Sequence, residues 1–256
     1  MQLPPNIKDF LEEKYRKYAS SEFIASDPIQ IPHRYENSED IEIAGFISAT
    51  LAWGQRPQIV KAAANWLNQM GESPYEFIME ANSSNLKAFE NFYYRTFNGV
   101  DCIAFLTSLI RIYRSNSSLQ KIFTAGFQKD GTVLGAISYF RKIFIDSNFP
   151  NRSQKHVPNV LQGSSAKKIN MFLRWMVRSS REGVDLGIWN GIPPSALMLP
   201  LDTHSGRVAR SLGLLSRKQN DWKAVEEVTS NLRLLNKEDP VKYDFALFGL
   251  GIFEKF

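Results

Sequence analysis

Hydrophobic residues recur at three- and four-residue spacings along most of the chain, with polar residues between them. This spacing places the apolar side chains on one face of an α-helix and therefore predicts helices. We expect them over residues 6–18, 40–52, 57–70, 74–81, 86–94, 101–115, 133–145, 166–177, 203–212, 221–235 and 240–249. Alternating apolar and polar positions, which are typical of strands, are nearly absent. The pattern therefore predicts an all-α protein.

Two polar stretches rich in proline and glycine, residues 146–165 and 183–201, interrupt the predicted helices. The chain has 256 residues, of which 43% are hydrophobic, so it is long enough to bury a sizeable core. We expect a single two-lobed helical domain over residues 1–256. Within it, residues 157–177 form a hairpin-like region, and residues 199–256 form a turn with an aspartate and the closing helices.

Composition narrows the classes of function. Lysine and arginine number 31 against 26 aspartates and glutamates, a net charge of +5 that permits nucleic-acid binding without requiring it. The single cysteine, Cys102, excludes a disulfide framework and lies in an apolar run, where we expect a small core residue. The longest apolar stretch, 41–53, is too short to span a bilayer, and the N-terminus lacks a signal-peptide pattern. We therefore expect a cytoplasmic monomer with no membrane partner.

The segment from Pro200 onward carries the most chemical information. A proline-containing turn delivers Asp202 to the start of a predicted helix that also carries Arg207 and Arg210, with Arg217 a little further on. The carboxylate then lies beside the N–H groups of the helix terminus. We expect the three arginines to place this carboxylate close to a nucleic-acid backbone. The simpler interpretation is that Asp202 is only an N-cap, which stabilises a helix by about 1 kcal/mol.

A second segment opens the predicted helix at 166–177. Gly163, Ser164 and Ser165 form a turn whose backbone N–H groups are expected to bind a phosphate at the helix N-terminus. Lys167 and Lys168 add positive charge near the same phosphate in the first helical turn, and Lys168 is counted among the phosphate-binding residues. Lysines in this position are also often only solvated. Further along the same helix, a pair of arginines at 174 and 178 is expected either to contact phosphate or to face solvent.

Together these segments resemble the helix-hairpin-helix DNA glycosylases, the endonuclease III superfamily. The likeness consists of Pro-x-Asp-Thr-His followed by Arg-Val-Ala-Arg and Leu-Gly-Leu, and of the Leu-Gln-Gly-Ser-Ser hairpin with its lysines. Gln162 and Ser165 depart from the family's proline and second glycine. Residues 168–178 and 201–204 are also similar to an uncharacterised bacterial family of unknown function, a likeness that implies no established activity.

The glycosylase resemblance implies a role for each matched residue. Asp202 corresponds to the catalytic aspartate, and Lys167 falls where lyase-competent members carry their Schiff-base lysine. The adjacent lysine leaves open which of the two is the active amine. The loop before the aspartate carries Trp189, which either stacks on a base in the pocket or anchors the loop onto the core. Gln55 and Arg56, in a segment similar to the family's Leu-Ser-x-Gln-Thr, are candidates to fill the space that a flipped base leaves in the duplex.

The resemblance implies removal of a damaged base from double-stranded DNA, such as 8-oxoguanine, with or without strand cleavage at the resulting abasic site. A carboxylate stabilises the positive charge that develops on the sugar, and a lysine amine can attack C1′. No iron–sulfur cluster is expected, because no cysteine-rich loop follows the last helix, and no metal or organic cofactor is implied. Two alternatives remain: a nucleic-acid-binding protein of the same fold without catalysis, and a helical protein-interaction scaffold. The sequence does not specify the lesion.

Overall fold

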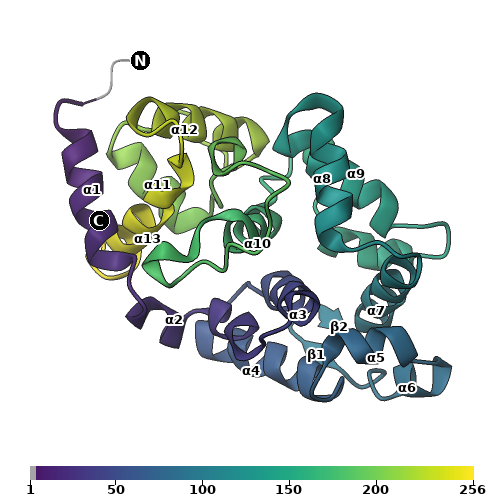
Figure 1. Cartoon of the computed structure of the whole chain (residues 1–256). Helices are drawn as coiled ribbons and strands as arrows, with labels where there is room; N and C mark the ends of the chain where they lie inside the picture. Colours follow the sequence, from purple (N-terminus) through teal and green to yellow (C-terminus); the bar gives the residue numbers. More distant parts are fainter. Residues whose placement is uncertain (1–3) are drawn as a thin grey trace. The chain divides into compact units, whose positions relative to one another are not determined.

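The computed structural model describes residues 4–256, and these are mostly helical, as the spacing of hydrophobic residues predicts (Figure 1). The contacts divide the chain into two compact units. Unit 1 combines Met1–Ala25 with Asn159–Phe256, and unit 2 is the continuous stretch Ser26–Pro158. In the described part of the chain, no helix is long and apolar enough to cross a membrane.

Unit 1 is built from long α-helices joined by short 3-10 turns. Its α-helices are α1 (Ile7–Tyr18), α10 (Lys167–Val177), α11 (Thr203–Ser211), α12 (Trp222–Leu235) and α13 (Asp244–Ile252), with α2 (Glu22–Ser26) leading to the unit boundary. Its 3-10 turns are η4 (Val160–Gln162), η5 (Ser180–Glu182), η6 (Pro194–Ala196) and η7 (Pro240–Tyr243). Helix α13 packs against both α1 and α11. These helices lie together in Figure 1, although α1 comes from the opposite end of the chain.

A glycine on α13 permits this close packing. A Cβ atom on Gly249 would lie 2.1 Å from Cδ2 of the Tyr18 ring, which is far inside van der Waals contact. The same end of α1 is tied to the C-terminal segment by Glu254, whose Oε1 accepts a hydrogen bond from the Tyr18 hydroxyl at 2.5 Å and one from Lys17 at 2.9 Å. Unit 1 therefore joins the first helix of the chain to the last.

Unit 2 contains a large aromatic core. Its α-helices are α3 (Ser38–Thr50), α4 (Arg56–Asn68), α5 (Pro74–Glu80), α6 (Ser83–Lys87), α7 (Gly99–Arg114), α8 (Leu119–Asp130) and α9 (Val133–Phe144). Its 3-10 turns are η1 (Pro28–Gln30), η2 (Pro32–Arg34) and η3 (Asn151–His156). Helices α8 and α9 lie side by side (Figure 1). Rings from different helices meet in the core, for example Phe123 and Phe140, whose centroids are 4.5 Å apart. Cys102 is fully buried in α7, as expected, and burial raises the pKa of its thiol.

The structure corrects two sequence predictions in unit 2. The expected helix over 86–94 ends at Lys87, and the segment then turns into an antiparallel hairpin of β1 (Tyr93–Tyr94) and β2 (Phe97–Asn98). Tyr94 and Phe97 are buried there, and Tyr94 donates a hydrogen bond to the Trp53 carbonyl oxygen at 2.7 Å. Helix α8 was not predicted, although Ser118 caps its start and Gly131 ends it with φ 71°. Both end signals were present in the sequence.

Candidate active site

Asp202 occupies the N-cap of α11, where its backbone is extended. Its Oδ1 accepts hydrogen bonds from the His204 and Ser205 amides at 2.8 and 2.9 Å, and from the Ser205 hydroxyl at 3.2 Å. In return, the Ser205 hydroxyl oxygen accepts the Asp202 N–H at 2.9 Å, completing a capping box. The side chain is half-buried. Among the described residues, the hydrogen bonds to the Asp202 carboxylate all use Oδ1, so Oδ2 is available to another group.

The three arginines near this aspartate do not form the expected phosphate-facing group. Arg210 turns back and donates through Nε to the Arg217 carbonyl oxygen at 2.8 Å. Arg217 itself forms a two-point pair with Asp221, with distances of 2.6 and 2.5 Å. Arg207 reaches the Gly251 carbonyl oxygen at 3.3 Å. Each of these guanidinium groups donates hydrogen bonds to a carbonyl or carboxylate oxygen of unit 1. Together they stabilise the loop after α11 and the end of α13.

The hairpin before α10 has the expected turn, but some of its backbone N–H groups already form hydrogen bonds within the turn. Gly163 has φ 86°, and its N–H donates to the Val160 carbonyl oxygen at 3.0 Å. The Ser164 N–H donates to the Asn159 carbonyl oxygen at 3.1 Å. These two N–H groups are therefore already satisfied. The residue before α10, Ala166, provides no side-chain cap, so a phosphate at this turn would meet the first-turn N–H groups of α10. Phosphate binding by Gly163, Ser164, Ser165 and Lys168 remains a prediction.

The two lysines at the start of α10 occupy different environments. Both are half-buried, but successive helical positions point roughly 100° apart. Burial lowers the pKa of Lys168 to about 7, and the neighbouring Lys167 charge lowers it as well. The Lys168 amine is therefore partly neutral near pH 7, as an attacking amine must be. Lys167 instead lies on the helix face that also carries Arg174.

That face of α10 carries a buried network of ion pairs. Arg174 and Arg178 are only 4% and 3% exposed. Arg174 pairs with Asp185 at 3.2 Å and with Asp244, while Arg178 pairs with Asp185 and, at 2.8 Å, with Asp239. The prediction that these arginines contact phosphate or face solvent is therefore wrong. Their charges are compensated inside unit 1.

Asp244 connects this network to the predicted catalytic residues. It is the first residue of α13 and is 7% exposed. Burial raises the pKa of Asp244 to about 6; the Arg174 charge opposes this rise, the Asp202 charge adds to it, and the Lys167 charge opposes it. The Asp202 turn and the start of α10, 35 positions apart in the sequence, therefore both act electrostatically on Asp244.

Trp189 lies in the loop between α10 and α11 and is 3% exposed. Its ring meets Phe172 of α10 edge-to-face, with the centroids 5.3 Å apart, and its backbone N–H donates to the Met176 carbonyl oxygen at 2.8 Å. The residue thus anchors the loop onto α10, the second of the two roles that the sequence allowed. A base could stack on this indole only if the loop moved.

Gln55 and Arg56 belong to unit 2, whereas Asp202 and the lysines belong to unit 1. Gln55 is exposed at the N-cap of α4. The guanidinium of Arg56 is held by Asp27, with an N–O distance of 3.6 Å, and by the Ser26 hydroxyl at 3.2 Å. Of the two, Gln55 has the side chain more open to a partner. Their proposed role in the duplex remains a prediction.

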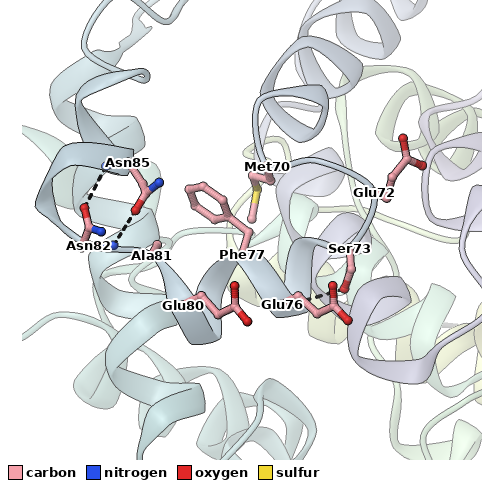
Figure 2. Close-up of a pocket in the computed structure, with 9 residues that line it drawn as sticks. All are labelled: Met70, Glu72, Ser73, Glu76, Phe77, Glu80, Ala81, Asn82 and Asn85. Carbon is pink, nitrogen blue, oxygen red and sulfur yellow. Dashed lines mark hydrogen bonds between the residues drawn. The ribbon is translucent and has the colours of Figure 1, made fainter.

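Unit 2 holds a pocket beside α5 and another beside α7, and neither of these is lined by a predicted site residue. The first, of about 440 Å³, lies beside α5, and Figure 2 shows Met70 and Phe77 pointing toward one another in it. Its other lining residues are Glu72, Ser73, Glu76, Glu80, Ala81, Asn82 and Asn85. The three glutamates would repel a polyanion such as DNA. The second, of about 280 Å³, is bounded mainly by one face of α7 and the loop that follows α9.

Sequence reasoning missed Asp185, Asp239 and Asp244. A signal for them existed, because Arg174 and Arg178 stand among apolar residues of a helix and a buried cation requires a nearby anion. Asp244 likewise precedes an apolar run. Over residues 4–256, no three histidine, cysteine, aspartate or glutamate side chains are grouped as metal ligands.

The comparisons with known proteins identify one family. The model of a protein family of unknown function, DUF2400, matches residues 27–253. No curated protein matches the chain, and no solved structure does. The match covers most of both units, including the Asp202 turn, the tandem lysines and Asp244. The chain belongs to the DUF2400 family.

Proposed function

We propose that the protein is a base-excision enzyme similar to the helix-hairpin-helix DNA glycosylases. Its substrate would be a damaged base in double-stranded DNA, with an oxidised purine such as 8-oxoguanine as the first candidate. One observation carries the proposal: the half-exposed Asp202 carboxylate, held at the N-cap of α11 through Oδ1, keeps Oδ2 available among the described residues. The working form would be a cytoplasmic monomer.

The chemistry assigns one role to each group. The bond between C1′ and the base breaks, the base leaves with the electron pair, and positive charge develops on the sugar. Asp202 would stabilise that charge through Oδ2 while Oδ1 holds the cap. In the lyase branch, the lone pair of a neutral lysine amine would bond to C1′ as the base leaves, and the amine would lose a proton. The C1′–O4′ bond would then break, its electron pair going to O4′, which takes up a proton, while the nitrogen lone pair forms the imine.

Either of the two lysines can supply that amine. Lys167 matches the position of the Schiff-base lysine in the DNA glycosylases, and the lowered pKa of Lys168 makes its amine partly neutral. A neighbouring cation and burial are both known ways to activate a lysine. The Lys167→Ala and Lys168→Ala variants separate the two assignments, because a trapped covalent adduct is lost only when the attacking amine is removed.

The test is incubation of the protein with a panel of duplexes that each carry one lesion, with and without borohydride. We expect excision of at least one base, and trapping if a lysine attacks. Asp202→Asn and Asp202→Ser are matched variants, since both side chains can still cap α11 but carry no charge. Both should lose excision while keeping the fold and duplex binding.

Two outcomes would favour the alternatives. Duplex binding without excision on any substrate, and with Asp202→Asn unchanged in every assay, would indicate a nucleic-acid-binding protein. Absence of any salt-dependent affinity for duplexes would indicate a protein scaffold, because phosphate contacts always weaken as salt rises.

A further inference from the structure

The hairpin of β1 and β2 in unit 2 has one buried face and one exposed face (Figure 1). Tyr94 and Phe97 lie on the buried face. Tyr93 and Asn98 are paired across the two strands, so their side chains share the opposite face, with Cβ atoms about 5 Å apart. The Tyr93 side chain is 74% exposed, and no other aromatic ring of the described residues contacts it. The ring therefore contributes little to the core and is open to a partner.

The 3-10 turn η3 brings two cations to this face. Arg152 donates through Nη1 to the Asn98 Oδ1 at 2.6 Å, which places its guanidinium beside the partner residue of Tyr93. Its Nη2 lies 3.4 Å from Oδ2 of the fully buried Asp101, so two partners orient this guanidinium. Lys155 follows three positions later, and residues three apart in a 3-10 turn lie on the same side. Lys155 is exposed, and its amine forms no ion pair with any described residue.

The turn of the hairpin adds a third cation. Arg95 has φ 56°, in the left-handed region that favours glycine, so an arginine is strained there. Its guanidinium lies over the loop between α3 and α4, since a Cβ atom on Gly54 would lie 2.7 Å from the Arg95 Nη1. The next residue of that loop is the exposed Gln55. Arg95 is itself exposed and pairs with no carboxylate of the described residues, so its charge is available to an anion.

An exposed ring between cations fits one kind of partner. Proteins hold unpaired nucleic-acid strands by stacking bases on aromatic side chains while basic residues contact the phosphates. A duplex offers the same phosphates, but its bases are stacked on one another and do not reach such a ring. An acidic peptide matches the charge but has no flat ring in its acidic side chains. The combination of ring and cations therefore favours an unpaired strand.

We propose that the face formed by Tyr93, Arg95, Arg152 and Lys155 binds an unpaired nucleic-acid strand. One base stacks on the Tyr93 ring, and the flanking phosphates contact Arg95 and Lys155. Arg152, oriented by its two partners, lies beside the stacked base. This site goes beyond the proposed function, because it belongs to unit 2 alone and does not require base excision.

The first test is fluorescence anisotropy with labelled, undamaged oligothymidylate and oligouridylate of equal length. Tyr93→Ala should weaken binding roughly tenfold through loss of one stacked base, whereas Tyr93→Phe should bind like the wild type. A third oligonucleotide, in which tetrahydrofuran replaces every nucleoside, keeps the phosphates but has no bases. On this probe the wild type and Tyr93→Ala should have equal affinity. The two natural strands show whether DNA or RNA binds more tightly.

The second test uses the strained turn. Arg95→Gly removes the cation and also relieves the positive φ, so thermal melting should be unchanged or raised while affinity falls several-fold. The dependence of log affinity on log salt should become shallower by about 0.7, the value for one phosphate of a single strand, and Lys155→Gln should have the same effect. Lys129→Gln is the matched control, because it removes one exposed cation of α8 outside this face. Its affinity and salt dependence should stay close to those of the wild type.

The outcomes distinguish this site from the proposed function. Wild-type affinity in Tyr93→Ala, or a loss in Lys129→Gln as large as that in Arg95→Gly, overturns the inference even if the protein excises bases. Displacement of the strand by a polyglutamate peptide of equal charge, at the same concentration as unlabelled strand, indicates an acidic protein partner and also overturns it. A wild type that excises no base from any duplex but shows the Tyr93 and Arg95 effects overturns only the proposed function.

Discussion

Replacing Asp244 by Asn should change the pH dependence of stability in a calculable way. The Asp244 pKa rises from 3.8 to about 6 on folding, first because the carboxyl is buried. The folded protein therefore holds this proton more tightly than the unfolded chain does. Each pH unit corresponds to about 1.4 kcal/mol, so the ionised group lowers the free energy of unfolding by about 3 kcal/mol at neutral pH. Below about pH 4 both states are protonated and the penalty is absent.

Urea unfolding of the wild type and of Asp244→Asn at a series of pH values measures this difference. Relative to the variant, the wild type should lose about 3 kcal/mol as the pH rises from about 4 to about 6, and nothing more above that window. Carboxylates that titrate elsewhere, such as Glu254 with a pKa of about 2, contribute equally to both proteins and cancel. A difference that is flat across the window, or one that grows in the wild type's favour, would refute the assignment.

Three further predictions concern Asp202, Arg178 and Lys168. Asp202→Ala should lower the free energy of unfolding by about 1 kcal/mol through loss of the cap, whereas Asp202→Ser should stay near wild type. Thermal melting distinguishes the two variants, and equal losses of stability would argue against the capping role. Arg178→Ala leaves Asp185 and Asp239 without their shared cation, so we expect a loss of about 3–5 kcal/mol in urea unfolding, and a value near zero would contradict the buried pairing. A limiting amount of acetic anhydride at pH 7 should modify Lys168 ahead of exposed lysines, because its pKa of about 7 leaves much of the amine neutral. Peptide mass spectrometry measures the order of modification, and late modification of Lys168 would contradict the lowered pKa.

Local signals along the chain specified most helices and the chemical character of the Asp202 turn. The 3.6-residue periodicity placed α10 and α12 within one or two residues, because each buries an apolar stripe. The Asp-x-x-Ser spacing at Asp202 specified the cap, because capping depends only on residues three positions apart. Where local signals competed, the prediction failed: the segment 86–94 has helical spacing, but the packing of Tyr94 and Phe97 makes it a hairpin.

Tertiary structure alone decided which charges meet. Arg174 and Arg178 have the spacing of a solvated helix face. That face becomes interior only because the following loop brings Asp185 back onto it and because Asp239 and Asp244 reach it from distant segments. The same holds for the tandem lysines, which are alike in sequence but acquire different surroundings. Periodicity reports which side of a helix is buried, whereas the partner of a charge depends on how segments far apart in the chain pack together, and so it is absent from any local pattern.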